Sequence, residues 1–226
     1  MITGETRLVG LLGDPVSGSL SPLMQNAAFA ARGLDWAYVP LPVQAERLEQ
    51  AVTGLATLGF AGANVTTPHK VQVAKLVGAG LPSVNTLVVR DGRVHGSSTD
   101  TAILAELQFE RAAILGDGGA AAAFTAALPE ASRFSRRGTW PPDVTGVDLV
   151  VNATSERREV IVELGPRQTL VDLPYPATAT AAAAAEQGAR VVDGLDVLVA
   201  QGAASFELWT GIEAPVDVMR SAVRSR

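Results

Sequence analysis

The chain has 226 residues, of which 47% are hydrophobic and 18% are charged, and its formal net charge is −5. An acidic chain without a basic block lacks the electrostatic signature of a nucleic-acid-binding protein. The absence of cysteine excludes a disulfide framework, a thiolate metal site and a cysteine nucleophile. No apolar run reaches the roughly 18 residues of a membrane span, and the first residues lack a signal-peptide pattern, so we expect a cytoplasmic protein that enters no membrane.

Short apolar runs alternate with helical stretches, a pattern that predicts an α/β fold. In the first half of the chain, Pro22 is typical of a first helical turn after an N-cap at Ser21, and Gly33 is typical of a helix end. Asp91-Gly92 strongly indicates a two-residue hairpin. The predicted strands there are 7–12, 37–41, 60–65, 85–90 and 93–95, and the predicted helices are 22–32, 45–57, 68–77 and 99–110.

The second half of the chain continues the alternation with apolar, β-branched strands that are typical of a parallel sheet buried on both faces. The segment 136–147 holds two prolines and two glycines, so we expect a loop there. The predicted strands are 112–115, 148–152, 170–173 and 189–192, and the predicted helices are the alanine-rich stretch to about 128, then 177–187, 195–209 and 216–225.

A glycine-rich turn, Gly116-Asp117-Gly118-Gly119-Ala120, lies between a predicted strand and a predicted helix. Glycines in that place let backbone N–H groups approach a pyrophosphate, and the helix N-terminus adds a partial positive charge. The alternative is an ordinary strand-to-helix turn, because Ala121 stands where the third glycine of the full motif is expected. Asp117 would oppose anion binding if its carboxylate pointed inward.

A second polar segment, Asn64 to Lys70, lies where a strand ends and a helix begins, and ligands bind at such places. Lys70 and Lys75 are the only lysines in the chain, and all its other basic residues besides the two histidines are arginines. Lysine can be tuned into a proton donor and acceptor, whereas arginine stays protonated. The alternative is a lysine on a solvated helix face.

Two hydroxyl-rich segments also lie before helices. In Ser98-Thr99-Asp100, the bland alternative is an N-cap with Asp100 favouring the helix dipole. In the segment from Ser17 to Pro22, it is a serine-rich loop. The two histidines, His69 and His95, lack the spacing of metal ligands, so we expect no metal. Trp209 is interpreted as a packing residue.

Together these motifs resemble the shikimate dehydrogenase family. The resemblance extends from about Val9 to Gly211 and rests on segments that occur in the family's order. They are Ser19-Leu-Ser-Pro22, Asn64-Val-Thr-Thr-Pro-His-Lys70, Val84-Asn-Thr86, Ser98-Thr-Asp100, Gly116–Ala120, the run from Asp148 to Thr154, and the run from Asp193 to Gly211.

The resemblance implies an NADP-dependent enzyme that interconverts 3-dehydroshikimate and shikimate on the route to chorismate and the aromatic amino acids. It implies an α/β substrate-binding domain over residues 1–104, to which residues 196–226 return. A compact Rossmann-like domain over 105–195 would bind NADP, with NAD less favoured, in a cleft between the two. No nucleic acid or membrane partner is implied, and a homodimer is the candidate assembly.

The family's functional residues carry over by motif. Lys70 and Asp100 match the catalytic pair. Substrate binding is implied for Ser19, Ser21, Thr66, Asn85, Tyr175 and Gln201. Cofactor binding is implied for Gly116, Gly118, Gly119, Ala120, Arg136, Thr154 and Gly194, with Arg136 holding the 2′-phosphate.

The cofactor half departs from the family pattern. Only 129–147 separates the glycine-loop helix from the next strand of the motif, which leaves no room for a further strand and helix, so one helix is expected to be missing. Ser135-Arg136-Arg137 stands where the family has Asn-Arg-Thr, and Asp117, Asp196 and Val197 also differ. Two alternatives therefore stay open: a quinate-using relative, and a shikimate-binding paralogue without cofactor affinity.

Overall fold

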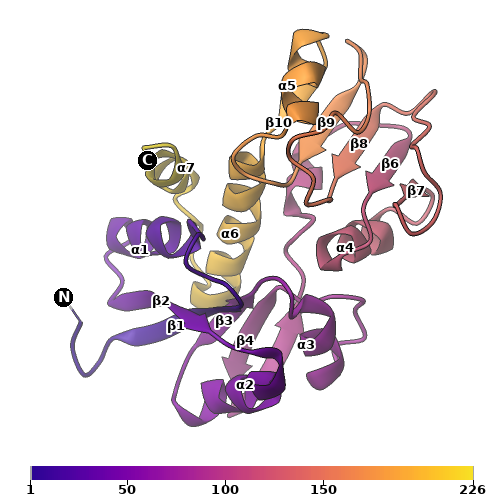
Figure 1. Ribbon diagram of the computed structural model, residues 1–226. Coiled ribbons are helices and arrows are strands. Elements are labelled where there is room, and N and C mark those ends of the chain that lie inside the picture. Colours follow the sequence, from indigo (N-terminus) through magenta and orange to yellow (C-terminus); the bar gives the residue numbers. More distant parts are fainter. Residues whose placement is uncertain (1, 226) are drawn as a thin grey trace. The chain divides into compact units, whose positions relative to one another are not determined.

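The computed structural model describes residues 2–225 (Figure 1). The chain forms two compact units. One unit comprises the residues up to Thr99 together with those from Val199 onward, and the other runs from Asp100 to Leu198. The sequence analysis expected the boundaries between the two domains at 104/105 and 195/196. None of the helices between residues 2 and 225 combines the length and apolar composition needed to cross a bilayer.

The first unit is built on a mixed five-stranded sheet in the order β2-β1-β3-β4-β5. Strands β2, β1 and β3 are parallel to one another, and the hairpin of β4 and β5 is added antiparallel to β3 at the other side of the sheet. Asp91 and Gly92 at the hairpin tip have positive φ angles of 50° and 70°, which confirms the predicted turn. The strands are β1 (Arg7–Gly13), β2 (Trp36–Pro42), β3 (Gly62–Val65), β4 (Thr86–Arg90) and β5 (Arg93–Ser97).

Helices supply the apolar residues that cover this sheet. Leu48, Val52 and Leu55 of α2 join Val73 of α3 in one buried cluster against the strands. Phe29 of α1 stacks on Phe206 of α6, with ring centroids 5.4 Å apart, in a second packing region. The helices are α1 (Ser21–Ala31), η1 (Ala45–Arg47), α2 (Leu48–Thr57), α3 (Lys70–Leu76), α6 (Gly194–Thr210) and α7 (Val216–Arg224).

The N-cap expected at Ser21 is wrong. Ser21 is the first residue of α1, Leu20 holds the cap position, and no side chain caps this end. The Ser19 hydroxyl instead accepts a hydrogen bond from the Ser21 N–H at 3.2 Å. The Ser19 side chain therefore forms a local turn with Ser21, and Ser21 does not cap the helix.

The second unit is a fully parallel five-stranded sheet in the order β10-β9-β8-β6-β7. Its core strands are buried throughout, as the β-branched, apolar sequence predicts. The strands are β6 (Ala112–Leu115), β7 (Ser132–Phe134), β8 (Leu149–Asn152), β9 (Thr169–Asp172) and β10 (Arg190–Val192). The remaining helices are η2 (Ala102–Glu106), α4 (Gly119–Ala127) and α5 (Ala179–Glu186).

Three segments from 99 to 148 differ from expectation or sharpen it. The three-residue strand β7 was not predicted, because so short a run carries no periodic signal. From Ser135 to Asp148 the chain forms neither helix nor strand, which confirms the predicted loop and the missing helix. The helix predicted over 99–110 is wrong: only the 3₁₀ helix η2 forms, with N–H groups that bond three residues back, and the backbone is extended again at Leu107.

Candidate active site

Polar residues of the first unit gather where strands give way to loops. Ser19 and Ser21 follow β1, and Ser21 is buried although Ser19 is only partly so. Thr66 follows β3, and its N–H donates to the carbonyl of Leu12 at 2.8 Å. These hydroxyls therefore come from the carboxyl ends of two neighbouring strands, where a ligand is expected in an open α/β sheet.

Lys70 begins α3 and is half-buried. The residue before it, His69, is almost fully buried, and its ring Nε2 lies 2.6 Å from the carbonyl oxygen of Val43. The Lys70 carbonyl accepts from the Val84 N–H at 3.0 Å. Packing and hydrogen bonds thus fix the backbone of this lysine, whereas Lys75, one turn further on, is exposed.

Asn85 lies just before β4 and is 2% exposed. Its Oδ1 accepts from the Thr99 N–H at 2.7 Å, and its Nδ2 donates to the Thr99 hydroxyl at 3.0 Å and to Gln201 Oε1 at 3.1 Å. The structure thereby brings together two predicted substrate residues, Asn85 and Gln201. It also replaces the N-cap alternative for Thr99, whose N–H and hydroxyl are bonded to Asn85.

A buried hydrogen-bond network continues from Asn85 to Thr86, Ser205 and Asn64. The Thr86 hydroxyl lies 2.9 Å from the Ser205 hydroxyl, and Asn64 Nδ2 donates to both hydroxyls. Tyr38 donates to Asn64 Oδ1 at 2.9 Å. Sequence reasoning assigned no role to Tyr38 or Ser205, because neither belongs to a run of polar residues. Such fully partnered networks hold polar side chains in one arrangement.

Asp100 directly follows Thr99 and is 4% exposed. It is the first residue of the second unit, whereas Lys70 belongs to the first. Tyr175 also lies in the second unit, partly buried, and its carbonyl accepts from Arg157 Nη2 at 2.9 Å. The pairing of Lys70 with Asp100 and the place of Tyr175 beside a substrate stay predictions.

The glycine-rich turn joins β6 to α4. Gly116 has a φ of 120°, and a Cβ there would lie 2.8 Å from the carbonyl oxygen of Ala153. Gly118 is the N-cap of α4, no side chain caps this end, and no atom lies within 4 Å of where its Cβ would be. Gly119 and Ala120 form the first turn. The first N–H groups of a helix lack partners within it, so this turn fits a phosphate.

The neighbouring strand ends add polar and close-packed groups to the same edge of the sheet. Asn152, at the end of β8, accepts at its Oδ1 from the Thr154 N–H at 3.1 Å and from the Thr154 hydroxyl at 2.8 Å. Its Nδ2 donates to Asp172 at 2.7 Å. Burial raises the pKa of Asp172, against the hydrogen bonds from Asn152 and Thr178. A Cβ at Gly194 would collide with the Pro174 carbonyl.

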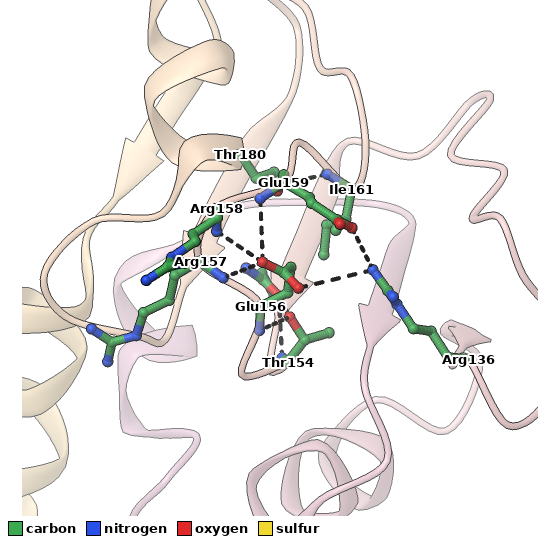
Figure 2. A network of polar contacts seen from close by, with 9 residues as sticks. Arg136, Thr154, Glu156, Arg157, Arg158, Glu159, Ile161 and Thr180 are labelled. Carbon is green, nitrogen blue, oxygen red and sulfur yellow. Dashed lines mark hydrogen bonds and ion pairs between the residues drawn. The ribbon is translucent and has the colours of Figure 1, made fainter.

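Two arginines follow β7, about 20 residues after the glycine turn, where nucleotide-binding α/β domains read the ribose. Arg136 Nη2 donates to Glu159 Oε2 at 2.7 Å and lies 4.0 Å from Glu156 Oε2 (Figure 2). Arg137 Nη1 lies 3.6 Å from Asp117 Oδ2. The sequence left open where the Asp117 carboxylate points, and the structure places it beside Arg137. The glycine turn and these cations fit a phosphorylated nucleotide.

Metal-ligating side chains do not gather in threes or more anywhere in the part of the chain that the structure describes. The polar groups that the structure brings together in the first unit are the hydroxyls and amides around Asn85. These groups, with a glycine turn on a parallel sheet, define a two-domain nucleotide-dependent oxidoreductase.

Comparisons with known proteins agree with this class. Residues 11–85 match the shikimate dehydrogenase substrate binding domain, and residues 194–224 match the shikimate 5′-dehydrogenase C-terminal domain. A shikimate dehydrogenase (NADP(+)) of Moorella thermoacetica is 38% identical over 99% of this chain and 94% of its own length. The chain belongs to the shikimate dehydrogenase family.

Solved structures support the same relationship. A shikimate dehydrogenase in complex with NADP+ has a TM-score of 0.85 and 30% identity, covering 100% of this chain and 97% of its own. The Thermus thermophilus enzyme in complex with NADP(H) and shikimate has a TM-score of 0.82 and 27% identity, covering 97% and 99%.

The Moorella alignment is longer than this chain, with 278 positions against 226 residues. The relative therefore carries segments that this chain lacks.

Proposed function

We propose that this chain catalyses the reversible, NADP-dependent reduction of 3-dehydroshikimate to shikimate in the pathway to chorismate and the aromatic amino acids. The observation that carries the proposal is the polar cluster of the first unit, in which the Asn85 and Gln201 side chains meet over a buried network. A substrate with one carboxylate and several hydroxyls needs many neutral donors and acceptors, and this cluster supplies them.

The substrate carboxylate is assigned to Ser19 and Ser21. Thr66, Asn85 and Gln201 would bind its carboxylate or its hydroxyls, and Tyr175 would help to hold the substrate. Hydroxyl and amide donors bind a carboxylate without burying a second charge, which lowers the desolvation cost. Four protein groups use the donor and acceptor positions of the Asn85 amide, so a substrate hydroxyl bound by Asn85 would replace one of these hydrogen bonds. A side chain so held requires little ordering when the substrate binds.

Proton transfer is assigned to Lys70. When bound, the nicotinamide supplies or accepts the hydride. The oxygen at the reacting carbon then needs a proton in the reduction and must lose one in the oxidation. Lys70 can do both, whereas arginine in its place would remain protonated. Asp100 would hydrogen-bond the same oxygen and orient the ammonium group.

The nucleotide is assigned to the second unit, and the first unit with its returning C-terminal helices to the substrate. Gly116, Gly118, Gly119 and Ala120 would hold the pyrophosphate at the N-terminus of α4. Thr154 and Gly194 would line the remainder of the cofactor site. Arg136 would face the 2′-phosphate, which favours NADP over NAD by charge.

Shikimate-dependent reduction of NADP⁺, followed at 340 nm with the purified chain, tests this function. We expect turnover with shikimate and NADP⁺, slower turnover with NAD⁺, and slower turnover with quinate. Absence of turnover with either cofactor would overturn the proposal. Calorimetry with shikimate and with NADP⁺ then separates the remaining alternative, since a non-catalytic paralogue binds shikimate alone.

We place the activity in the cytoplasm and name the homodimer as the candidate assembly. Light scattering at several protein concentrations tests the assembly independently of activity, because a mass near that of one chain at every concentration contradicts a dimer.

A further inference from the structure

The loop after β8 presents two carboxylates to Arg136. Glu159 Oε2 lies 2.7 Å from Arg136 Nη2, and Glu156 Oε2 lies 4.0 Å from the same nitrogen (Figure 2). Trp140 adds a ring to the same group, with its centroid 5.6 Å from the Arg136 guanidinium carbon. Arg136 is therefore engaged on several sides by side chains from its own unit.

The backbone of this loop holds the Glu156 carboxylate in place. Glu156 Oε1 accepts from the N–H groups of Arg157, Arg158 and Glu159 at 2.9, 2.8 and 3.2 Å. These bonds, with the positive charge of Arg136, lower the pKa of Glu156 despite the opposing effect of burial. Glu156 therefore stays ionised and fixed in orientation.

Glu159 is tied down at its main chain. Thr180 of α5 donates its hydroxyl to the Glu159 carbonyl at 3.3 Å and accepts from the Ile161 N–H at 3.1 Å. The Glu159 side chain is 65% exposed, and its Oε2 lies 2.7 Å from Arg136 Nη2. An exposed ion pair is weak, so a phosphate can displace it, but the displaced carboxylate remains nearby.

A 2′-phosphate and a 2′-hydroxyl would meet these groups differently. The phosphate carries close to two negative charges and would share Arg136 with two carboxylates that repel it. A hydroxyl is neutral and can donate to a carboxylate. The pair Glu156 and Glu159 thus opposes the preference that Arg136 confers.

We propose that Glu159 is a specificity-determining residue, which competes with the nucleotide 2′-phosphate for Arg136 and narrows the preference for NADP over NAD. This inference rests on the proposed placement of the nucleotide in the second unit. It goes beyond the proposed function because it assigns the strength of the preference for NADP over NAD to a residue that lies outside the glycine turn and is neither Arg136 nor Arg137.

Calorimetric titration of the full chain tests this at low salt, where charge effects are least screened. The probes are adenosine 2′,5′-bisphosphate, which carries the 2′-phosphate, and AMP, which lacks it. In Glu159→Gln we expect about threefold to tenfold tighter binding of the bisphosphate. AMP affinity should stay within about twofold, because only the 2′ group faces the changed charge.

Glu163→Gln is the matched control, since it removes the same charge from an exposed residue of the same loop region. It should leave both affinities within about twofold. In an Arg136→Gln background, Glu159→Gln should no longer tighten bisphosphate binding, because the competition needs the arginine. Thermal unfolding of each variant verifies that the fold is intact.

Unchanged or weaker bisphosphate binding in Glu159→Gln overturns the inference, as does an equal gain for AMP. Failure of the wild-type chain to bind either nucleotide overturns it too. Loss of shikimate-dependent turnover in the wild type would instead overturn the proposed function, since the nucleotide titrations need neither shikimate nor catalysis.

Discussion

Asn85 Nδ2 donates a 3.1 Å hydrogen bond to Gln201 Oε1, although 116 residues separate the two. Asn85 precedes strand β4, and Gln201 lies on helix α6. The contact joins the middle of the chain to its returning C-terminal part within one unit. It therefore links the fold of the first unit to its proposed substrate site.

Gln201→Ala should weaken shikimate binding by about tenfold, because one or two hydrogen bonds to the substrate are lost. Asn85 keeps its bonds to Thr99, so the melting temperature should change little. Calorimetry with shikimate measures the affinity. Gln187→Ala, at an exposed position of the other unit, is the control and should bind shikimate normally. Normal binding by Gln201→Ala would remove this residue from the site.

Lys70→Ala should lower kcat by about a hundredfold to ten-thousandfold while shikimate affinity changes only a few-fold. Lys70→Arg should not restore the rate, because the guanidinium cannot give up its proton at neutral pH. Steady-state kinetics and calorimetry on the same samples separate the two effects. The exposed Lys75 provides the control as Lys75→Ala. A Lys70→Arg enzyme with wild-type kcat would contradict a proton-transfer role.

Gly118→Ala should weaken NADP binding by about tenfold or more without loss of stability, because the added methyl group stands where the backbone must approach a phosphate. No neighbour lies within 4 Å of the new atom, and the backbone is extended with a φ of −81°. Calorimetry with NADP and thermal unfolding are the measurements. Gly165→Ala, also in open space, should leave both unchanged. Retained affinity in Gly118→Ala would contradict the assigned phosphate position.

Gly62→Ala should destabilise the first unit by about 2–4 kcal/mol, as overpacking does in close-packed interiors. The methyl group would collide with the Leu87 carbonyl and the Trp209 indole. These two groups are themselves hydrogen-bonded, Trp209 Nε1 donating at 2.9 Å. Gly54→Ala, inside helix α2 with open space around it, should instead stabilise by about 0.5–1 kcal/mol. Urea unfolding gives both values, and equal effects would show that packing at Gly62 is loose.

Asp148 should make stability depend on pH in the acid range. Burial raises its pKa, but hydrogen bonds from the N–H groups of Glu110 and Arg111 outweigh this, so the pKa lies below the ordinary 3.8. A lowered folded-state pKa stabilises the protein above the unfolded-state value, and this stability is lost as the pH falls through the folded-state value.

Asp148→Asn should therefore cost about 1 kcal/mol at neutral pH and lose less stability than the wild type as the pH falls below about 4. Unfolding free energies between pH 3 and pH 7 provide the measurement. Glu130→Gln, which removes a charge from an exposed position, is the control. A wild-type slope in Asp148→Asn would show that other carboxylates dominate.

The sequence by itself determined the α/β class, the hairpin at Asp91-Gly92 and nearly every strand, because period and turn chemistry are local properties. It also singled out the polar motifs, since they are contiguous at strand ends. It failed where a structure depends on distant partners. Thr99, which was predicted to begin a helix, instead bonds the side chains of Asn85 and Ser205, and β7 forms by pairing with β6.

Only the tertiary structure decided how the site residues are held. Asn85 owes its orientation to Gln201 and Thr99, and Arg136 owes its carboxylate neighbours to a loop 20 or more residues away. Such contacts join segments that are far apart in the sequence, which no local pattern in the sequence encodes. The residue types were therefore readable in advance, but their partners, and so the competition for Arg136, were not.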